Sequence, residues 1–392
     1  MFEVWDVIVV GAGPAGSSAA RVAAEAGARV LLLDRARFPR YKTCGGGITG
    51  FSVRAMPDAA RSAFEAEITD FGLSRAGRDR VMLHADEPFL GMVQRETFDQ
   101  LLVDAAVAAG AVFRDGTAVR GLVEEHDGVT VRLEGEQLRA RVVIGADGSN
   151  GRTSGYAGVE FAGTDLGLEV ELAASTDDWA GTALFDWGAD RGAYAWLFPK
   201  RDTLTIGVIQ RIGLPDATRA SLELWLRQLG LAGAARVRES GHLTRWRSRR
   251  SPLRRGSVLV AGEAAGLLEP WTREGISFAL RSGAMAGAAA ATAARAGDDA
   301  LRDAALDGYA AAVQRELAPQ IQAGAAMLTV LERAPRTLHR VLAHTRLGRR
   351  TFIALCRGSA RAAGLVDAPL VRVAARVLGA RARAVGAPGS QA

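Results

Sequence analysis

The 392-residue sequence predicts an α/β fold with a Rossmann-type domain, an inserted antiparallel β-sheet and a helical C-terminal region. A strand, a glycine-rich turn and a helix at the amino terminus predict the first part, and a second strand with small residues recurs about 250 residues later. Segments that alternate apolar and polar side chains between positions 167 and 210 predict the inserted sheet. With 48% hydrophobic residues, the chain can form two or three domains.

The amino-terminal motif, Gly-Ala-Gly-Pro-Ala-Gly, occupies residues 11–16 between an apolar strand pattern and a helix pattern. Gly11 permits a tight turn, and Gly13 lets backbone N–H groups approach a pyrophosphate. Gly16 allows the helix and the strand to pack closely. Asp34, which ends the next apolar run, can accept hydrogen bonds from ribose hydroxyls. The complete unit predicts a bound dinucleotide.

The second motif, at residues 257–266, repeats the order of strand, acid and helix start. Its Glu263 can bind ribityl hydroxyls, and the helix start at Gly275 and Ile276 can stabilise the anionic edge of a reduced flavin. Asp147 follows a third apolar strand, where a chain would meet the middle of a long ligand. A nicotinamide dehydrogenase needs only the first motif, whereas FAD uses both. The pair therefore predicts non-covalently bound FAD.

Composition excludes several kinds of site. Cys44 and Cys356, the two cysteines, have no dithiol or metal-ligand spacing, and the five histidines form no ligand pattern, so we predict no disulfide framework and no metal site. No segment has the pattern of a signal peptide or a membrane span, and we expect a cytoplasmic protein.

Basic residues are concentrated at the carboxyl end. From Arg333 onward there are twelve arginines and one acid, interleaved with apolar residues. This pattern indicates either peripheral contact with the inner face of a membrane or an ordinary solvated helical face. No aromatic interleaving accompanies the charge, so we do not expect nucleic-acid binding.

The predicted domains are discontinuous. We assign the FAD-binding domain to residues 1–48, 96–154 and 255–295, the substrate domain to residues 49–95 and 155–254, and the helical C-terminal region to residues 296–392. Four strands are predicted in the longer insertion, at residues 167–173, 181–187, 193–198 and 203–210. We expect this sheet to be the platform for the substrate.

An aromatic stripe marks one of these strands. Tyr194, Trp196 and Phe198 alternate with Ala195 and Leu197, so the three aromatic side chains share one face. They form either a core beneath a helix or the wall of an apolar channel over the flavin. The sequence does not decide between the two.

Several of these segments resemble the geranylgeranyl reductase family, within the superfamily typified by p-hydroxybenzoate hydroxylase. The matching segments are residues 11–16, 38–48, 95–99, 145–148, 194–200 and 262–283. The Cys-Gly-Gly loop that starts at Cys44 and the Tyr-x-Trp-x-Phe-Pro-Lys strand point to this family rather than to the superfamily. Glu263 stands where the family usually has Asp, and Arg273 stands where a Gly usually precedes Glu274.

The resemblance implies a set of site residues. Arg95 is expected to contact FAD, and the Cys-Gly-Gly loop is expected to line the reactive region of the flavin, where glycines allow close approach of the backbone. The predicted FAD contacts are Gly11, Gly13, Ala15, Gly16, Asp34, Arg35, Cys44, Gly45, Gly46, Gly47, Arg95, Val119, Asp147, Glu263, Gly275 and Ile276. Cys44, Tyr194 and Trp196 are the candidate catalytic residues, although Cys44 alternatively fills a tight apolar place.

The resemblance also implies an activity. We expect reduction of C=C bonds in a prenyl chain, such as a geranylgeranyl group or a menaquinone side chain, by hydride transfer from reduced flavin. The single dinucleotide unit is filled by FAD, so NAD(P)H or another external reductant has to act transiently. The alternatives are a flavin-dependent monooxygenase or halogenase of the same superfamily, and a flavin-binding membrane-associated protein without turnover.

Overall fold

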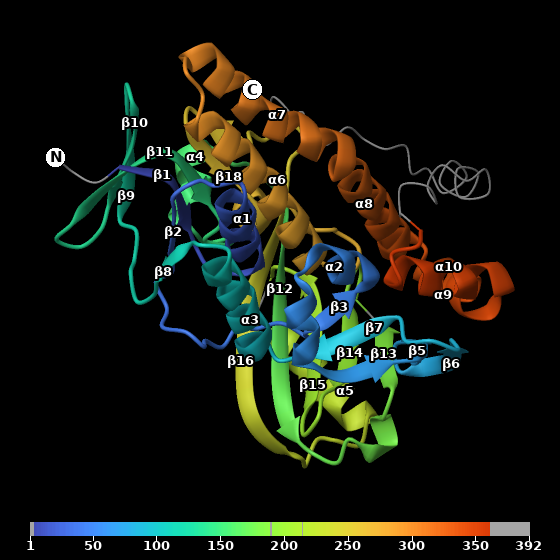
Figure 1. Cartoon of the computed structure of the whole chain (residues 1–392). Coiled ribbons are helices and arrows are strands. Elements are labelled where there is room, and N and C mark those ends of the chain that lie inside the picture. Colours follow the sequence, from blue (N-terminus) through green and yellow to red (C-terminus); the bar gives the residue numbers. More distant parts are fainter. Residues whose placement is uncertain (1–3, 189, 214, 361–392) are drawn as a thin grey trace.

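The computed structural model describes residues 4–188, 190–213 and 215–360, which form three sheets and the helices around them (Figure 1). The two larger sheets lie in different halves of the molecule, and the three-stranded sheet lies beside the second of them. Helices α7 (Asp299–Glu316) and α8 (Ala318–Arg333) run along one side, from the first half to the second.

The first sheet has eight strands in the order β17-β18-β11-β1-β2-β8, with β10 on β11 and β9 on β10. Its strands are β1 (Val4–Val10), β2 (Val30–Leu33), β8 (Val112–Arg114), β9 (Gly121–Glu125), β10 (Gly128–Arg132), β11 (Gln137–Gly145), β17 (Arg254–Arg255) and β18 (Val258–Val260). β1 pairs in parallel with β2 and β11, and β11 pairs in parallel with β18. The carboxyl ends of these four strands therefore meet at one edge of the sheet, the usual ligand-binding edge of such folds.

Helices α1 (Pro14–Glu25), α3 (Arg95–Ala108) and α6 (Ile276–Ala294) cover this sheet, and α4 (Arg152–Ala157) follows β11. A proline at the first position of α1 suits a helix start. The glycine and alanine content of α6 permits backbone contact with α1, because a Cβ on Gly283 would lie 2.1 Å from the carbonyl oxygen of Ala15. Among the described residues, no helix is long and apolar enough to span a membrane.

The second sheet has seven strands in the order β16-β12-β15-β14-β13-β5-β6. Its strands are β5 (Asp70–Arg75), β6 (Arg78–His84), β12 (Phe161–Ala173), β13 (Thr182–Trp187), β14 (Tyr194–Pro199), β15 (Leu204–Arg211) and β16 (Ala235–Arg247). Every pair is antiparallel except β13 with β5. The four strands expected from alternation are present, whereas β16 was missed because its first half is polar and exposed.

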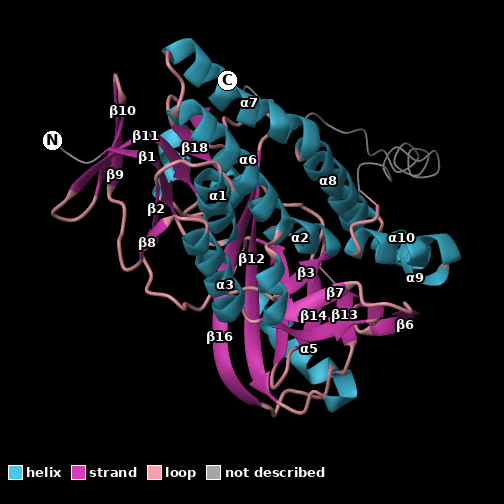
Figure 2. Cartoon of the chain, in the orientation of Figure 1, coloured by secondary structure: helices cyan, strands magenta, loops and turns pink. Residues whose placement is uncertain are grey.

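Helix α5 (Pro215–Gln228) covers one face of the second sheet (Figure 2). Leu222, Trp225 and Leu226 of this helix pack with the apolar side chains of β12, β14 and β15 that point to that face. The opposite face carries the aromatic stripe, which is buried in a separate core. The aromatic side chains are therefore held away from α5.

The smallest sheet consists of β3 (Gly47–Thr49), β7 (Leu90–Val93) and β4 (Phe64–Ile68). Helix α2 (Gly50–Ala55) and the 3-10 helix η1 (Asp58–Ala63) connect β3 to β4, and a second 3-10 helix, η2 (Asp177–Trp179), connects β12 to β13. A third 3-10 helix, η3 (Gly262–Ala265), follows β18.

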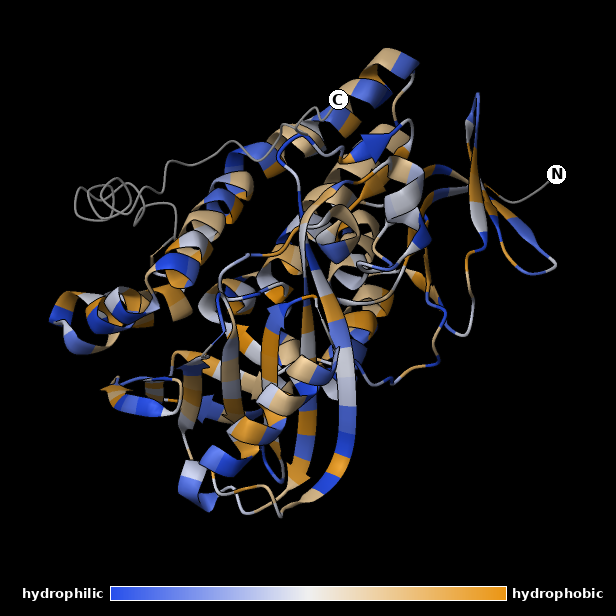
Figure 3. Ribbon diagram, turned by 180° about the vertical axis from the view of Figure 1, so that it is seen from behind, coloured by the Kyte–Doolittle hydropathy of each residue, from blue (hydrophilic) through white to orange (hydrophobic). Residues whose placement is uncertain are grey.

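The C-terminal region is helical, as expected, over the part of the chain that the structure describes. It contains α7, α8, α9 (Pro335–His344) and α10 (Arg346–Cys356), and Asp298 caps α7 by accepting a 2.8 Å hydrogen bond from the Leu301 N–H. Hydrophilic and hydrophobic bands alternate along the long helices (Figure 3), which is typical of helices with one buried face. Residues 361–392, including part of the arginine-rich segment, lie outside the described residues.

Candidate active site

One cavity of about 990 Å³ joins the carboxyl edge of the first sheet to the aromatic face of the second. It contains, on its walls, the predicted residues Gly11, Gly13, Ala15, Asp34, Arg35, Cys44, Gly45, Gly46, Gly47, Arg95, Val119, Asp147, Tyr194, Trp196, Glu263, Gly275 and Ile276. Gly16 does not line the cavity: a Cβ there would lie 1.7 Å from the carbonyl oxygen of Gly11. It therefore serves the packing of the turn rather than contact with a ligand.

The glycine turn is held by backbone contacts. Gly11 has a φ of +101°, and its N–H donates to the carbonyl oxygen of Leu33 over 2.7 Å. The Asp34 carboxylate accepts from the N–H of Ala12 and the N–H of Ala36, each at 2.8 Å. Asp34 thus fastens the end of β2 to the turn that follows β1, which is a second role beside the predicted contact with ribose.

The start of α1 forms an anion-binding cradle. No side chain caps this helix, and its first N–H groups have no acceptor within the helix. The Nη2 atom of Arg40 lies 3.0 Å from Asp99, while its Nη1 atom is buried without a hydrogen-bond partner among the described residues. A Cβ on Gly13 would lie 3.5 Å from Arg40, so the guanidinium stands beside the turn. A helix start and a buried unpaired donor fit the pyrophosphate of FAD.

The Cys-Gly-Gly loop lies at the middle of the cavity. The N–H of Cys44 donates to Glu169 over 2.8 Å, and the N–H of Gly46 donates to the Sγ atom of Cys44 over 3.4 Å. A Cβ on Gly45 would lie 2.8 Å from the ring of Phe198. Glycine is therefore required where this loop passes the aromatic stripe, and the backbone is open to a flat ring on the cavity side.

Arg95, the first residue of α3, makes a two-pronged ion pair with Asp99, in which both contacts are 2.8 Å. Burial opposes its charge, but Asp99 and the nearby Cys44 raise the pKa of Arg95 overall. The guanidinium is therefore a permanent cation at the cavity wall, as expected for a group that contacts FAD.

Glu263 and His242 form a pair where a ribityl chain was predicted. The Oε2 atom of Glu263 lies 3.0 Å from the Nε2 atom of His242. Burial alone would raise the pKa of Glu263, but the hydrogen bond and charge of His242, together with the charges of Lys42 and Arg95, lower it to about 2. Burial lowers the pKa of Lys42, and Glu263 partly opposes this change. The carboxylate is therefore ionised at neutral pH and can accept hydrogen bonds.

The start of α6 closes the cavity from another side. Gly275 is the N-cap residue, and the carboxylate of Glu274 accepts from the N–H of Ser277 over 2.7 Å. Arg273, the departure from the family pattern, has a φ of +57° and pairs with Asp165 at 2.7 Å. The carboxylate of Asp165, which lies more than a hundred positions earlier in the sequence, thus balances the positive charge of Arg273 in the cavity wall.

The aromatic stripe is both core and cavity wall. Tyr194, Trp196 and Phe198 are between 6% and 9% exposed, and all three line the cavity. Tyr194 donates its hydroxyl hydrogen bond to the carbonyl oxygen of Thr272, and burial raises its pKa. The Nε1 atom of Trp196 is buried without a partner in the described part of the chain. The two interpretations left open by the sequence are therefore compatible.

The cavity residues that were not singled out from the sequence include Arg40, Glu169 and His242. Arg40 lies in a segment that matches the family, and Glu169 is an acid on the inward side of a predicted strand, so both carried a signal. Burial raises the pKa of Glu169, and the Tyr41 hydroxyl donates to it over 3.1 Å. His242 gave no signal, because the strand that carries it was not predicted.

Comparisons with known proteins identify the family of this chain. A family model described as an FAD binding domain matches residues 4–186. Geranylgeranyl diphosphate reductase of Rhodobacter capsulatus is 33% identical over 305 residues, covering 73% of this chain and 75% of that protein. Digeranylgeranylglycerophospholipid reductase of Methanocaldococcus jannaschii is 28% identical over 318 residues, covering 76% of this chain and 79% of that protein.

The fold has a solved counterpart. A geranylgeranyl bacteriochlorophyll reductase-like protein from Thermoplasma acidophilum superposes with a TM-score of 0.81 at 21% identity, and the match covers 96% of this chain and 100% of that one. This likeness shows that the two proteins share the fold. The chain is a member of the geranylgeranyl reductase family and an FAD-dependent oxidoreductase.

Proposed function

We propose that this enzyme reduces C=C bonds of a prenyl chain, such as a geranylgeranyl group or a menaquinone side chain, by hydride transfer from reduced FAD. The observation that carries the proposal is the continuity of one cavity from the glycine turn to an apolar end walled by Phe71, Phe185 and Phe352. Burial of a prenyl chain there is favourable by about 0.8 kcal/mol per CH₂ group. The names of the two relatives support the same substrate class.

At the polar end, the chain binds and orients FAD. The turn and Arg40 bind the pyrophosphate, Asp34 binds the adenosine ribose, and Glu263 binds the ribityl hydroxyls. The start of α6 at Gly275 lines the same cavity and would favour negative charge on a bound flavin through the helix dipole. FAD bound by these residues would supply the hydride once it is reduced.

At the junction of the two ends, Cys44, Tyr194 and Trp196 shape the site of the alkene. The N–H of Gly46 donates to the Sγ atom of Cys44, and the indole N–H of Trp196 lies beside Gly45 without a hydrogen-bond partner among the described residues. Tyr194 donates to the Thr272 carbonyl oxygen, and its raised pKa keeps it protonated. We therefore assign Tyr194 to positioning the loop before α6 rather than to proton donation.

An external reductant completes the cycle. The sequence contains one complete unit of strand, glycine-rich turn, helix and terminal acid, at its amino terminus, and FAD would occupy it. NAD(P)H or another two-electron donor therefore acts from outside, reduces the flavin and leaves before or during turnover.

The proposal is tested by a single-turnover experiment without oxygen. FAD-saturated enzyme is photoreduced and mixed with geranylgeranyl diphosphate or a menaquinol, whose ring is already reduced and cannot reoxidise the flavin, with the fully saturated analogue of each as the control. We expect reoxidation of the flavin and products that are heavier by two hydrogens per turnover, and no change with the saturated analogues.

Two results would count against this activity. Reduced flavin that no prenyl substrate reoxidises excludes prenyl reduction as stated. Stoichiometric oxygen consumption with a hydroxylated or halogenated product would assign the enzyme to the monooxygenases or halogenases of the superfamily instead.

A further inference from the structure

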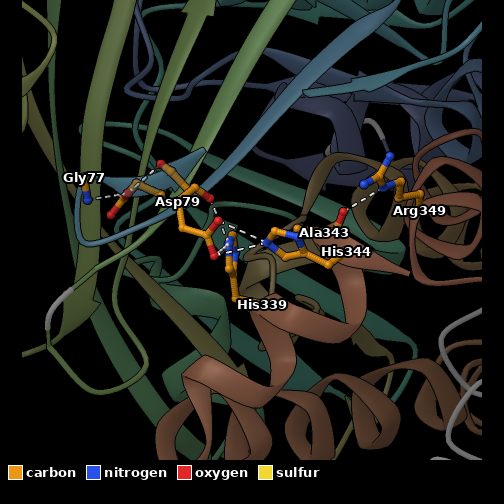
Figure 4. A network of polar contacts seen from close by, with 8 residues as sticks. Gly77, Asp79, His339, Ala343, His344 and Arg349 are labelled. Atoms are coloured by element: carbon orange, nitrogen blue, oxygen red, sulfur yellow. Dashed lines mark hydrogen bonds and ion pairs between the residues drawn. The ribbon is translucent and has the colours of Figure 1, made fainter. Parts of the chain in front are cut away.

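Asp79, His339 and His344 converge where α9 packs against β5 and β6 (Figure 4). Asp79 is the second residue of β6, just after the turn that joins β5 to β6, and the two histidines lie on α9. One potential ligand atom from each residue lies within 4.8 Å of the others. From this geometry we propose a binding site for a divalent transition-metal cation of the zinc class, made by these three side chains.

The distances fit metal ligands. The Oδ2 atom of Asp79 lies 3.3 Å from the Nε2 atom of His339 and 3.1 Å from the Nε2 atom of His344. With zinc–nitrogen and zinc–oxygen bonds of about 2.0–2.1 Å, the edges of a tetrahedron are about 3.3 Å long. Two edges of the group therefore match a tetrahedral site, and all three potential ligand atoms lie within 4.8 Å of one another.

The chemistry of the three groups selects the cation. Two imidazoles and one carboxylate suit Zn²⁺ and related first-row cations, whereas Ca²⁺ and Mg²⁺ prefer oxygen ligands. The side chain of His339 is 3% exposed, while those of Asp79 and His344 are 57% and 41% exposed. One side of the group is therefore open to solvent, and water can take the fourth position.

The histidine tautomers permit this coordination. Without a cation, Nε2 of His339 is 3.0 Å from the backbone oxygen of Asp79, and Nε2 of His344 is 3.1 Å from the carboxylate. The Nδ1 atom of His339 has no hydrogen-bond partner among the described residues. The oxygen atoms of Asp79 accept these hydrogen bonds, so without a cation the Nε2 atom of each histidine carries the proton. A cation that binds Nε2 displaces this proton to Nδ1 or to solvent, and no hydrogen bond of the His339 Nδ1 atom in the described part of the chain opposes that change.

Such a cation fastens two walls of the apolar end. Phe71 on β5 and Phe352 on α10 both line the cavity, and their ring centroids are 5.0 Å apart. The site ties the β5–β6 turn to α9, which directly precedes α10. We predicted no metal site because the sequence has no metal-ligand spacing. That prediction considered only residues near one another in sequence, whereas Asp79 precedes His339 by 260 residues.

The test measures binding directly. Full-length FAD-saturated protein without an affinity tag is freed of metal with a chelator and titrated with Zn²⁺, and in parallel with Co²⁺, whose visible absorption reports tetrahedral coordination. We expect one equivalent of Zn²⁺ per chain and a rise in Tm that the chelator reverses.

Two variants remove ligands with little harm to the fold. Asp79→Asn keeps a residue that tolerates the φ of +53° at this position, and His344→Ala changes an exposed side chain. Both should weaken zinc binding at least about tenfold and abolish the rise in Tm, with the FAD content unchanged. The matched control is His84→Ala, because His84 also lies on β6 and pairs with Asp70 at 2.9 Å outside the group. It should bind zinc like the natural chain.

Absence of stoichiometric zinc binding by the natural chain would overturn the proposal and leave the group as hydrogen bonds alone. Equal binding by Asp79→Asn and His344→Ala would overturn it as well. Neither result bears on prenyl reduction, because the measurement needs no substrate.

Discussion

The two ends of the cavity are built in different ways. At the polar end, the cavity is lined by short segments that each follow a parallel strand: Gly11 after β1, Asp34 after β2, Asp147 after β11 and Glu263 after β18. At the apolar end, the walls are side chains of β5, β13, β14 and α10, which meet only in the folded chain. The first end depends on backbone geometry, and the second depends on packing.

The largest predicted effect belongs to the apolar end. Trp196→Ala should lower the free energy of unfolding by about 3–5 kcal/mol, because the ring is 8% exposed and lies over Gly207, where a Cβ would be 2.1 Å away. FAD bound per folded chain should be unchanged, because the polar end is built separately. Urea denaturation and flavin absorbance measure the two quantities.

Trp179→Ala, at a half-buried tryptophan in η2, is the matched control and should have a smaller effect. A stable Trp196→Ala protein that has lost its FAD would show that the two ends are not independent.

This difference also explains how much could be predicted from the sequence. Gly11, Asp34 and Glu263 were identified because their signal is local, a strand followed at once by a turn. The sequence did not identify the partner of Arg273, which is Asp165, or the partner of Glu263, which is His242. Separate strands of the folded sheets bring these pairs together. The stripe at residues 194–198 was found, but its dual role as core and wall depends on what packs against it.

The second prediction concerns pH at the polar end. The pKa of Glu263 falls from an ordinary 4.5 to about 2, so its ionised form stabilises the fold at neutral pH by an amount on the order of 3 kcal/mol. This contribution is complete above about pH 4.5 and is lost as the pH falls towards 2.

The measurement is the difference in unfolding free energy between the natural enzyme and Glu263→Gln, followed with pH. We expect this difference to shrink as the pH falls below about 4.5, and His242→Asn should shift that decline to higher pH. A difference that does not depend on pH would remove the pair from the electrostatics of the polar end.

The third prediction separates packing from binding within the glycine turn. Gly16→Ala places a Cβ 1.7 Å from the Gly11 carbonyl oxygen and should cost about 1–3 kcal/mol of stability, with loss of FAD as a consequence. Gly13→Ala meets nothing closer than Arg40 at 3.5 Å, so the fold should persist while the added methyl group impedes the approach of the pyrophosphate. Thermal melts and FAD titration distinguish the two, and equal loss of stability in both variants would contradict the assignment.

The smallest effect is expected outside the cavity, beyond the apolar end. Arg340 and Arg350 lie exposed on α9 and α10, together with Leu347, whose side chain is 65% exposed. If this surface meets the membrane that holds a prenyl substrate, Arg340→Gln should reduce binding to anionic vesicles by about 1 kcal/mol at low salt, and less at high salt. Flotation with anionic and neutral vesicles measures this binding, with Arg132→Gln on β10 as the exposed control.

Substitution is preferable to truncation near residue 300, because the helices beyond it bury Tyr309, Leu331 and Phe352. Equal flotation of the natural protein, Arg340→Gln and Arg132→Gln, or no flotation at any salt concentration, would show that these arginines form an ordinary solvated helical face. The apolar end of the cavity would then have no entrance that faces a membrane.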